Sequence, residues 1–310
     1  MLFLLSNIVN AQTPQNSIEV VVLSDLNASY GSVTYPFEVH QAVNKLIELQ
    51  PDIVLITGDM VAGQFKNANS KAMWNAFHTD IMTPLSNSGI IVAPTPGNHD
   101  ASGYSSYKAE RKVYIEYWSK NKPNLDYLDD SHFPLYYSFT IEDTLFVSLD
   151  DTKVGPLDSM QQAWLRDQLS YRYDTKIVYG HLPLYPVVKK KNNEVIGDPN
   201  LERLFINQDV DLFISGHHHA YFPGRRNNVR YLSMPCLGDG SRLLWNTNNR
   251  SAKGYVTFDI YNGEIINLDS YTGEHLNEVV PRSSLPLYVG SDPYIIERDD
   301  ISIQSHRHSE

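Results

Sequence analysis

Apolar runs and segments with a single apolar face alternate along the first two-thirds of the chain. Apolar runs of about 4–8 residues between turn residues predict buried strands, and apolar positions about three or four residues apart predict helices. The predicted strands lie at 18–24, 53–57, 90–94, 175–180 and 211–215. The predicted helices lie at 69–83, 106–121 and 199–207, and another begins at Pro36, where the fixed φ of proline costs little.

The pattern changes after residue 133, where strand-like segments begin to follow one another directly. Segments 135–141 and 145–150 are typical of antiparallel strands joined by a tight turn at Glu142-Asp143. Ser159 and Gln162 match a capping box at the start of a further helix. The remaining strand-like segments lie at 231–234, 254–261 and 264–271.

These elements fit one domain at residues 17–284, with no internal repeat and no low-complexity linker to divide it. We expect the fold class α/β (α+β), a four-layer α-β-β-α sandwich in which helices flank two mixed β-sheets. Residues 285–310 show no strong pattern, so we expect a C-terminal extension whose last residues are disordered.

We expect residues 1–16 to be either the remnant of a signal peptide or a flexible arm. An apolar segment precedes Val9-Asn10-Ala11, which resembles the small-residue cleavage site of a secretory signal, although a basic region is missing before it. We therefore expect export to the periplasm or the exterior, with a cytoplasmic location as the alternative.

The charge of the chain limits the partners. A formal net charge of −11 argues against binding of a nucleic-acid backbone. A small phosphorylated substrate stays compatible with it, because bound divalent metals reverse the local sign of charge. The basic run Lys189-Lys190-Lys191 is a solvated loop or a patch that steers such a substrate. The single cysteine excludes an intramolecular disulfide, no run is long enough to cross a membrane, and the oligomeric state is not specified.

Five predicted strands end in short blocks of carboxylate, amide or imidazole side chains. The blocks are Asp25-Leu26-Asn27, Gly58-Asp59, Gly97-Asn98-His99-Asp100, Gly180-His181 and Gly216-His217-His218-His219. Catalytic groups of α/β folds gather beyond the carboxyl ends of strands. Packing does not explain five such strand ends, so we expect the blocks to share one site.

The donor types predict a pair of divalent metals. Carboxylate, imidazole and amide oxygen suit Zn, Mn or Fe, and the absence of thiolate disfavours a structural zinc site. Two metals about 3.5–4 Å apart need a bridging ligand, for which Asp59 is the natural candidate. Glycines precede Asp59, Asn98, His181 and His217, where we expect them to let the backbone turn sharply.

The five blocks resemble the calcineurin-like metallophosphoesterase family. Its pattern is Asp-x-His, Gly-Asp, Gly-Asn-His-Asp/Glu, Gly-His and Gly-His-x-His, and the blocks follow that order over residues 18 to 220. The flanking segments Phe146–Thr152 and Gln162–Leu169 also look like the central strand of the family and the helix after it. The combination of the third and fifth blocks is highly specific.

The resemblance implies two metal ions. The first would be held by Asp25, Asp59 and His219. The second would be held by Asp59, Asn98, His181 and His217. His99 would face the leaving group without binding metal, and His218 would point away. Asp100 would either orient His99 by a hydrogen bond or cap the following turn.

The chain departs from the family pattern at Asn27, where a histidine ligand of the first metal is usual. Asn27 can offer its side-chain oxygen, which suits a harder metal such as Mn better than Zn or Fe. Tyr30 is a candidate for contact with substrate or metal, or else packs on the surface. Arg242 is a candidate for bidentate phosphate binding. Ala62 replaces the tyrosine of purple acid phosphatases, so no tyrosinate–iron chromophore is expected.

The resemblance implies metal-dependent hydrolysis of phosphomonoesters or phosphodiesters, with two divalent metals and with His99 and Asp100 as the catalytic pair. A hydroxide that bridges the metals would attack phosphorus, and His99 would protonate the leaving group. The alternative is a metal-binding scaffold with little turnover, in which Asn27 has weakened the first metal site.

Overall fold

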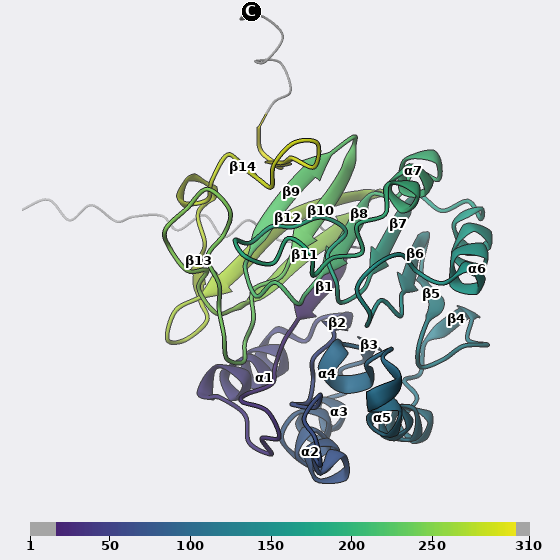
Figure 1. Cartoon of the computed structure of the whole chain (residues 1–310), viewed down its shortest axis with the longest axis vertical. Coiled ribbons are helices and arrows are strands. Elements are labelled where there is room, and N and C mark those ends of the chain that lie inside the picture. Colours follow the sequence, from purple (N-terminus) through teal and green to yellow (C-terminus); the bar gives the residue numbers. More distant parts are fainter. Residues whose placement is uncertain (1–16, 302–310) are drawn as a thin grey trace, which may run out of the picture.

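The computed structural model describes residues 17–301, which form two β-sheets with helices on their outer faces (Figure 1). The first sheet has the strand order β13-β12-β11-β1-β2-β3, and the second has the order β14-β15-β9-β10-β8-β7-β6-β5-β4. Both sheets mix parallel and antiparallel pairs. The expected four-layer arrangement of two mixed sheets and flanking helices is confirmed.

The bounds of the elements agree with most of the predicted segments. The strands of the first sheet are β1 (Ile18–Leu23), β2 (Ile53–Thr57), β3 (Val92–Thr95), β11 (Tyr255–Tyr261), β12 (Glu264–Thr272) and β13 (Glu278–Val279). The strands of the second sheet are β4 (Asp126–Asp129), β5 (Tyr137–Ile141), β6 (Thr144–Ser148), β7 (Thr175–Tyr179), β8 (Leu212–Ser215), β9 (Phe222–Arg226), β10 (Val229–Ser233), β14 (Tyr288–Val289) and β15 (Ile296–Arg298). The α-helices are α1 (Phe37–Leu49), α2 (Ser70–Phe77), α3 (Thr83–Asn87), α4 (Asn98–Ala101), α5 (Lys108–Lys120), α6 (Ser159–Leu169) and α7 (Pro199–Asn207).

Three layers of apolar side chains hold the four structural layers together. Val22 of β1 and Phe146 of β6 belong to the layer between the two sheets. Val21 of β1 packs instead in the layer beneath α1, α2 and α5. Phe213 of β8 packs in the layer beneath α6 and α7. The central strands are thus covered on both faces, which explains why they are continuous apolar runs rather than alternating ones.

Parallel pairing brings the strand ends that carry the polar blocks to common edges. β1, β2 and β3 are parallel neighbours in the first sheet. β6, β7, β8 and β10 are parallel neighbours in the second sheet. The residues that follow β1, β2, β3, β7 and β8 therefore leave the carboxyl ends of their strands together.

A polar joint ties the two sheets beneath these strand ends. Thr95 Oγ1 of β3 donates to the carbonyl of Leu149 at 2.7 Å, and Ser148 Oγ of β6 donates to Thr95 Oγ1 at 2.9 Å. Tyr137 of β5 donates to the carbonyl of Pro94 at 2.7 Å. All of these groups are buried, so the joint fixes how β3 lies against the second sheet just before Gly97.

One local prediction was wrong, and another helix contains an irregular turn. The cap of α6 is Asp158, whose carboxylate accepts the N–H of Gln161 at 2.8 Å, and Ser159 is the first helical residue. An aspartate one position earlier satisfies the same free N–H groups, so the predicted capping box is not used. The predicted helix at 69–83 is present as one continuous helical segment, in which a π-helical turn at His78–Met82 joins α2 to α3.

The chain after residue 284 contains strands that the sequence pattern did not predict. β14 pairs with β15, and β15 pairs with β9 at the edge of the second sheet. Strands of two and three residues are too short to produce a recognisable alternation of polarity. The predictions of a signal peptide and of a disordered C-terminal end fall on residues 1–16 and 302–310, outside the described residues. Between residues 17 and 301, no helix has the length and apolar character to cross a membrane.

Removal of the hydroxyl of Thr95 should loosen the joint between the sheets. Thr95→Val keeps the shape of the side chain but leaves the Leu149 carbonyl and the Ser148 hydroxyl without their partner. We expect the free energy of unfolding to fall by about 1–3 kcal/mol, measured by urea denaturation. Thr140→Val, on a half-buried position of β5, should change it by less than about 0.5 kcal/mol. Equal stability of the two variants would contradict the role of the joint.

Candidate metal centre

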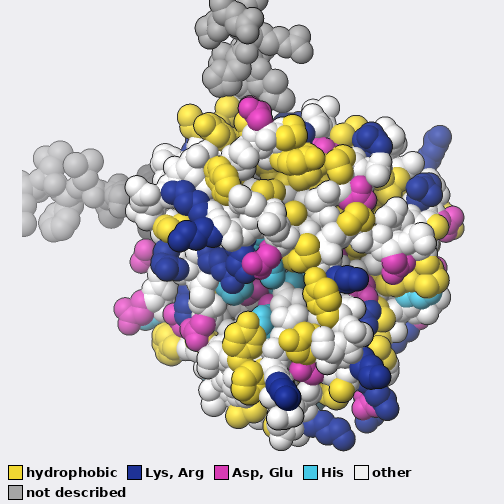
Figure 2. All heavy atoms as spheres, in the orientation of Figure 1, with side chains coloured by type: hydrophobic (Ala, Val, Ile, Leu, Met, Phe, Trp, Pro, Cys, Tyr) yellow, Lys and Arg dark blue, Asp and Glu magenta, His cyan; other side chains and the backbone are white. Residues whose placement is uncertain are grey.

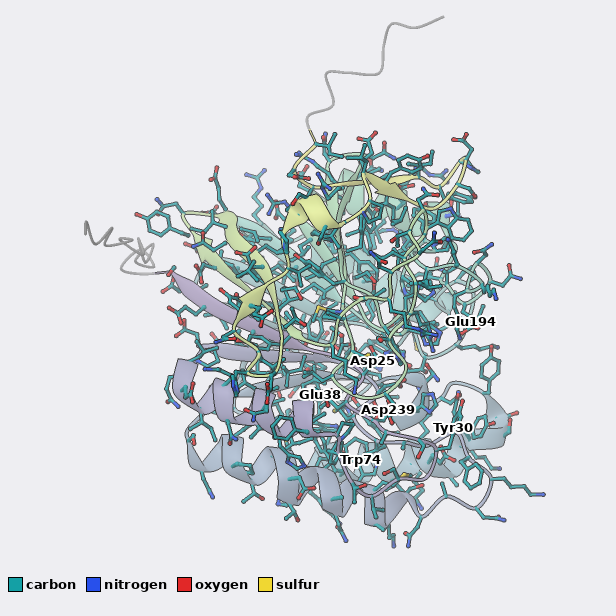
Figure 3. The ribbon with its side chains drawn as sticks, turned by 90° about the vertical axis from the view of Figure 1, so that its left-hand side faces the viewer. Asp25, Tyr30, Glu38, Trp74, Glu194 and Asp239 are labelled. Carbon is teal, nitrogen blue, oxygen red and sulfur yellow. The ribbon has the colours of Figure 1, made fainter. Side chains whose placement is uncertain are left out.

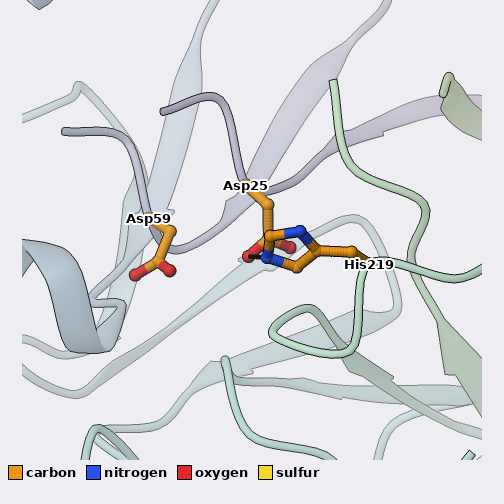
Figure 4. A group of neighbouring side chains, drawn as sticks. All are labelled: Asp25, Asp59 and His219. Atoms are coloured by element: carbon orange, nitrogen blue, oxygen red, sulfur yellow. Dashed lines mark ion pairs between the residues drawn. The ribbon is translucent and has the colours of Figure 1, made fainter. Parts of the chain in front are cut away.

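The five polar blocks converge, as expected, at the carboxyl ends of their strands. Asp25, Asp59 and His219, which follow three different strands, each place a ligand atom within 4.8 Å of the others (Figure 4). Asp25 and Asp59 are 0% and 1% exposed. On one face of the molecule, histidine side chains gather near the centre, with basic and acidic side chains beside them (Figure 2).

Four of the expected ligands have a left-handed backbone. The φ angles of Asp25, Asp59, His217 and His219 are 50°, 55°, 60° and 48°. This conformation is uncommon for residues other than glycine, and strained residues of this kind cost of order 1–3 kcal/mol each. The surrounding loops hold it in place: the N–H of Asp25 bonds to the carbonyl of Gly58 at 3.1 Å. Left-handed residues also occur in turns elsewhere in the described chain, but at the site four of the seven expected ligands share this conformation.

The glycines before the ligands act mainly by permitting close approach. Of the four, Gly58 alone has a positive φ, at 85°. At Gly97, a Cβ would lie 2.1 Å from the backbone nitrogen of Asp59, so any side chain there would separate the second and third blocks. The expectation that all four glycines provide the turn was therefore wrong, since the ligand residues make most of the turns themselves.

Asp59 lies at the centre of the cluster. Its Oδ1 accepts the backbone N–H of His99 at 2.8 Å. Its Oδ2 lies 3.4 Å from Nε2 of His181 and 3.8 Å from Nε2 of His99. Burial would raise the pKa of Asp59, but the neighbouring His181 and His99 outweigh burial and hold the pKa well below its ordinary value. Asp59 is therefore an anion that faces the imidazole of His181.

Asp25 forms the second anionic centre. Its Oδ1 lies 3.0 Å from Nε2 of His219, and its Oδ2 accepts from Ser24 Oγ at 2.6 Å and from the N–H of His217 at 3.1 Å. Burial would raise the pKa of Asp25, but the charge of His219 outweighs it and the pKa is lowered. Apart from this ion pair, Asp25 Oδ1 is buried without a hydrogen-bond partner among the described residues.

His181 is oriented by a backbone carbonyl. Its Nδ1 donates to the carbonyl of Thr57 at 2.8 Å, which directs Nε2 toward Asn98 Oδ1 at 2.9 Å. The amide nitrogen of Asn98 donates to Oε1 of Gln64 at 3.0 Å, so its oxygen faces the cluster. Gln64 was not predicted, because a glutamine in a loop after the Gly58-Asp59 block carries no signal of its own. These bonds point the expected ligand atoms of Asn98, His181 and Asp59 at one another.

The buried carboxylates raise the pKa values of two histidines, His181 and His219. Burial would lower the pKa of His181, but the carboxylate of Asp59 raises the pKa to about 10. Burial would likewise lower the pKa of His219, but Asp25 raises the pKa to about 10. In the metal-free chain both imidazoles are therefore protonated on both nitrogens and positively charged near neutral pH. Their two positive charges balance the negative charges of Asp59 and Asp25.

His99 lies at the rim, next to an exposed tyrosine. Nδ1 of His99 donates to the carbonyl of Gly63 at 2.9 Å, which leaves Nε2 toward the cluster. The ring of Tyr30, which is 62% exposed, lies 5.1 Å from the ring of His99. The carboxylate of Asp100 accepts the N–H groups of Gly97 and Val61, both at 2.9 Å. Asp100 thus ties the loops at Gly97 and Val61 together, and the bond that orients His99 comes from Gly63.

His217 and His218 contact a loop that the sequence did not identify as part of the site. Nε2 of His217 lies 3.0 Å from Oε2 of Glu194. His218, which was expected to point away, is buried against the same loop, where its Nδ1 accepts the N–H of Val187 at 3.3 Å and its Nε2 donates to the carbonyl of Glu194 at 3.2 Å. Glu194 follows no strand and no glycine, so no local signal marked it.

Asn27 and Arg242 lie beside the cluster with part of their polar groups already bonded. Nδ2 of Asn27 donates to the carbonyl of Val61 at 3.3 Å, which leaves its side-chain oxygen for another partner. Nη1 of Arg242 donates to the carbonyl of His217 at 2.5 Å. A guanidinium has further N–H groups, so this bond fixes Arg242 near the site without using all its donors.

The residues present fit divalent metal ions. Two buried carboxylates, three imidazoles and an amide oxygen are the donors that Mn, Zn and Fe accept. Metals would satisfy the buried Asp25 Oδ1, which has no hydrogen-bond partner among the described residues, and would replace the two histidine protons as counter-charge.

The fold and the donor set together define an α-β-β-α sandwich with a candidate metal centre at the sheet edges. The chain belongs to the calcineurin-like phosphoesterase family, whose model matches residues 18–221. The matched segment runs from β1 to just beyond the fifth block and thus includes all five blocks. The similarity to the family that the motifs indicated is confirmed.

Known proteins support the same assignment. The chain is 23% identical over 269 residues to an Arabidopsis thaliana protein whose name describes it as a metallophosphoesterase, covering 79% of this chain and 35% of that protein. It is 26% identical over 238 residues to purple acid phosphatase 23 of Arabidopsis thaliana, covering 65% of this chain and 49% of that protein. The chain thus spans half or less of the length of these curated relatives.

Solved structures share the fold. A purple acid phosphatase from yellow lupin (Lupinus luteus) seeds matches with a TM-score of 0.62 at 17% identity, over 83% of this chain and 51% of that one. A Plasmodium protein described as the anchor in the inner membrane complex matches with a TM-score of 0.56 at 14% identity, over 86% of this chain and 87% of that one.

Metal binding should release protons. A protonated imidazole cannot bind metal, so His181 and His219, both with a pKa of about 10, must each lose a proton when metals bind. We expect release of about two protons per chain at pH 7–8, counted by titration calorimetry in buffers of different ionisation enthalpy. The apparent metal affinity should rise with pH and level off near pH 10, since the competing protons are lost there. Binding without proton release would contradict these protonation states.

Proposed function

We propose that the protein hydrolyses phosphoesters, with two divalent metal ions held by the converging blocks. Asp25, Asp59 and His219 would hold the first ion, with the side-chain oxygen of Asn27 as a further ligand. Asp59, Asn98, His181 and His217 would hold the second ion, so Asp59 would bridge the pair. The observation that carries the proposal is the buried cluster of Asp25, Asp59 and His219, together with the family to which the chain belongs.

The metals supply Lewis-acid chemistry when bound: they polarise phosphoryl oxygens and make water acidic enough to attack near neutral pH. The residues of the chain then position the substrate and move a proton. His99 is the proton donor to the leaving group, and Nε2 is the atom that delivers it, because Nδ1 is bonded to the carbonyl of Gly63. Asp100 keeps His99 in place indirectly by fixing the loops at Gly97 and Val61.

Two side chains are candidates for contact with the substrate. Tyr30 is exposed and its ring adjoins that of His99, the proposed proton donor. Arg242 donates one N–H to the carbonyl of His217, and its guanidinium has further N–H groups that suit a phosphate. The side-chain oxygen of Asn27 favours Mn over Zn or Fe as the first ion.

Export is a separate proposal, which rests on the apolar N-terminal segment alone.

A panel of substrates tests the proposed function. The protein is stripped with a chelator, reloaded separately with Mn, Zn or Fe, and assayed on p-nitrophenyl phosphate, bis-p-nitrophenyl phosphate and nucleotides. We expect metal-dependent turnover of at least one ester type, highest with Mn. The absence of turnover with every metal and every ester would contradict the proposal.

A scaffold with little turnover is the second candidate. Asn27 replaces a usual histidine ligand, and the structural neighbour described as an anchor in Plasmodium shows that this fold serves proteins of that description. A scaffold would bind one metal per chain and turn over no ester. Metal content near two per chain with turnover of a chromogenic ester would exclude it.

His99→Ala should slow the reaction in a way that depends on the leaving group. For alkyl esters, whose leaving groups need a proton, we expect turnover to fall by about 10²–10⁴-fold while both metals stay bound. For p-nitrophenyl esters the loss should be smaller, because the leaving anion is stable without a proton. His40→Ala, an exposed histidine of α1, is the matched control and should change neither rate. Equal losses on both esters would show that His99 is not the acid.

A further inference from the structure

His218 of the fifth block holds the loop at 187–194 in place by hydrogen bonds. His218 bonds to it through both ring nitrogens, at Val187 and at the backbone of Glu194. These hydrogen bonds fix the position of Glu194. The side chain of Glu194 is 39% exposed and contacts His217. Figure 3 shows Glu194 and Tyr30 toward the same side of the molecule, with Asp25 deeper.

The contact between Glu194 and His217 determines which ring nitrogen of His217 carries hydrogen. A carboxylate only accepts hydrogen bonds, so a neutral imidazole that bonds to it must carry its hydrogen on the bonded nitrogen. The bonded atom is Nε2, 3.0 Å from Oε2 of Glu194. Nδ1 of His217 then has the lone pair that a metal needs.

We propose that Glu194 is a positioning residue of the metal centre, which holds Nε2–H of His217 and thereby presents Nδ1 of His217 to the second metal. The inference rests on the proposed metal centre. Lys191 pairs with the same carboxylate and helps to hold it in place. The carboxylate gains no metal contact of its own and acts only through the histidine, as acceptors behind ligating histidines do.

The simpler interpretation is that Lys191 and Glu194 form an ordinary surface ion pair, three residues apart, that contacts His217 by chance. Such pairs contribute little and can be lost without consequence. Lys112 and Glu116 of α5 form a comparable exposed pair, with no contact to the cluster. Glu116→Gln is therefore a matched control for variants of Glu194.

The first experiment reads the tautomer of His217 in the metal-free protein. Long-range ¹H–¹⁵N correlation spectra at pH 8, assigned by comparison with His217→Ala, distinguish hydrogen on Nε2 from hydrogen on Nδ1. We expect the Nε2–H form in the wild type and in Glu116→Gln, and a mixture of both forms in Glu194→Ala. The Nδ1–H form in the wild type, or an unchanged tautomer in Glu194→Ala, would overturn the proposal whether or not the protein is a hydrolase.

The second experiment measures metal affinity by competition with a chromogenic chelator, using Mn and Zn. Glu194→Ala should weaken one of the two metals by about 10–100-fold and leave the other unchanged. Glu194→Gln keeps an acceptor oxygen without the charge, so we expect a smaller loss. Unchanged affinity, tighter binding, or equal loss of both metals in Glu194→Ala would contradict a role confined to His217.

Discussion

The burial of two carboxylates in one cluster is the constraint on which the rest of the site depends. Asp25 and Asp59 are removed from water at the place where the strand ends meet. Like charges in such a place need cations within a few ångströms. In the chain alone, protonated His219 and His181 provide them, at 3.0 and 3.4 Å. Divalent ions would take over this role, so metal binding and the loss of two histidine protons are one exchange.

The fold meets the constraint by holding the ligands before any metal arrives. Parallel strands bring the blocks to common edges, the Thr95 joint fixes one sheet against the other, and left-handed residues turn the side chains inward. The cost of the strained backbone is offset by the apolar layers on both faces of each sheet. The loop at 187–194 adds a further support, since His218 anchors it and Glu194 contacts His217.

The sequence predicted the parts of the structure that have a local signal. Buried strands such as Ile53–Thr57 are continuous apolar runs, and the ligand blocks directly follow them, so both could be identified without a structure. The cap at Asp158 was missed because Ser159 matches a common motif equally well. β14 and β15 are too short to show a period, and Glu194 reaches His217 only through the folding of a loop. Contacts of this kind depend on tertiary structure and leave no pattern in neighbouring residues.

The central claim is that the five blocks build one centre for two metal ions that share Asp59. A crystal of the protein grown with Mn, with diffraction recorded above and below the Mn absorption edge, tests it most directly. The account predicts two anomalous peaks about 3.5–4 Å apart, one on each side of the Asp59 carboxylate. A single peak between Asp25 and His219, or two peaks that share no carboxylate of Asp59, would contradict it.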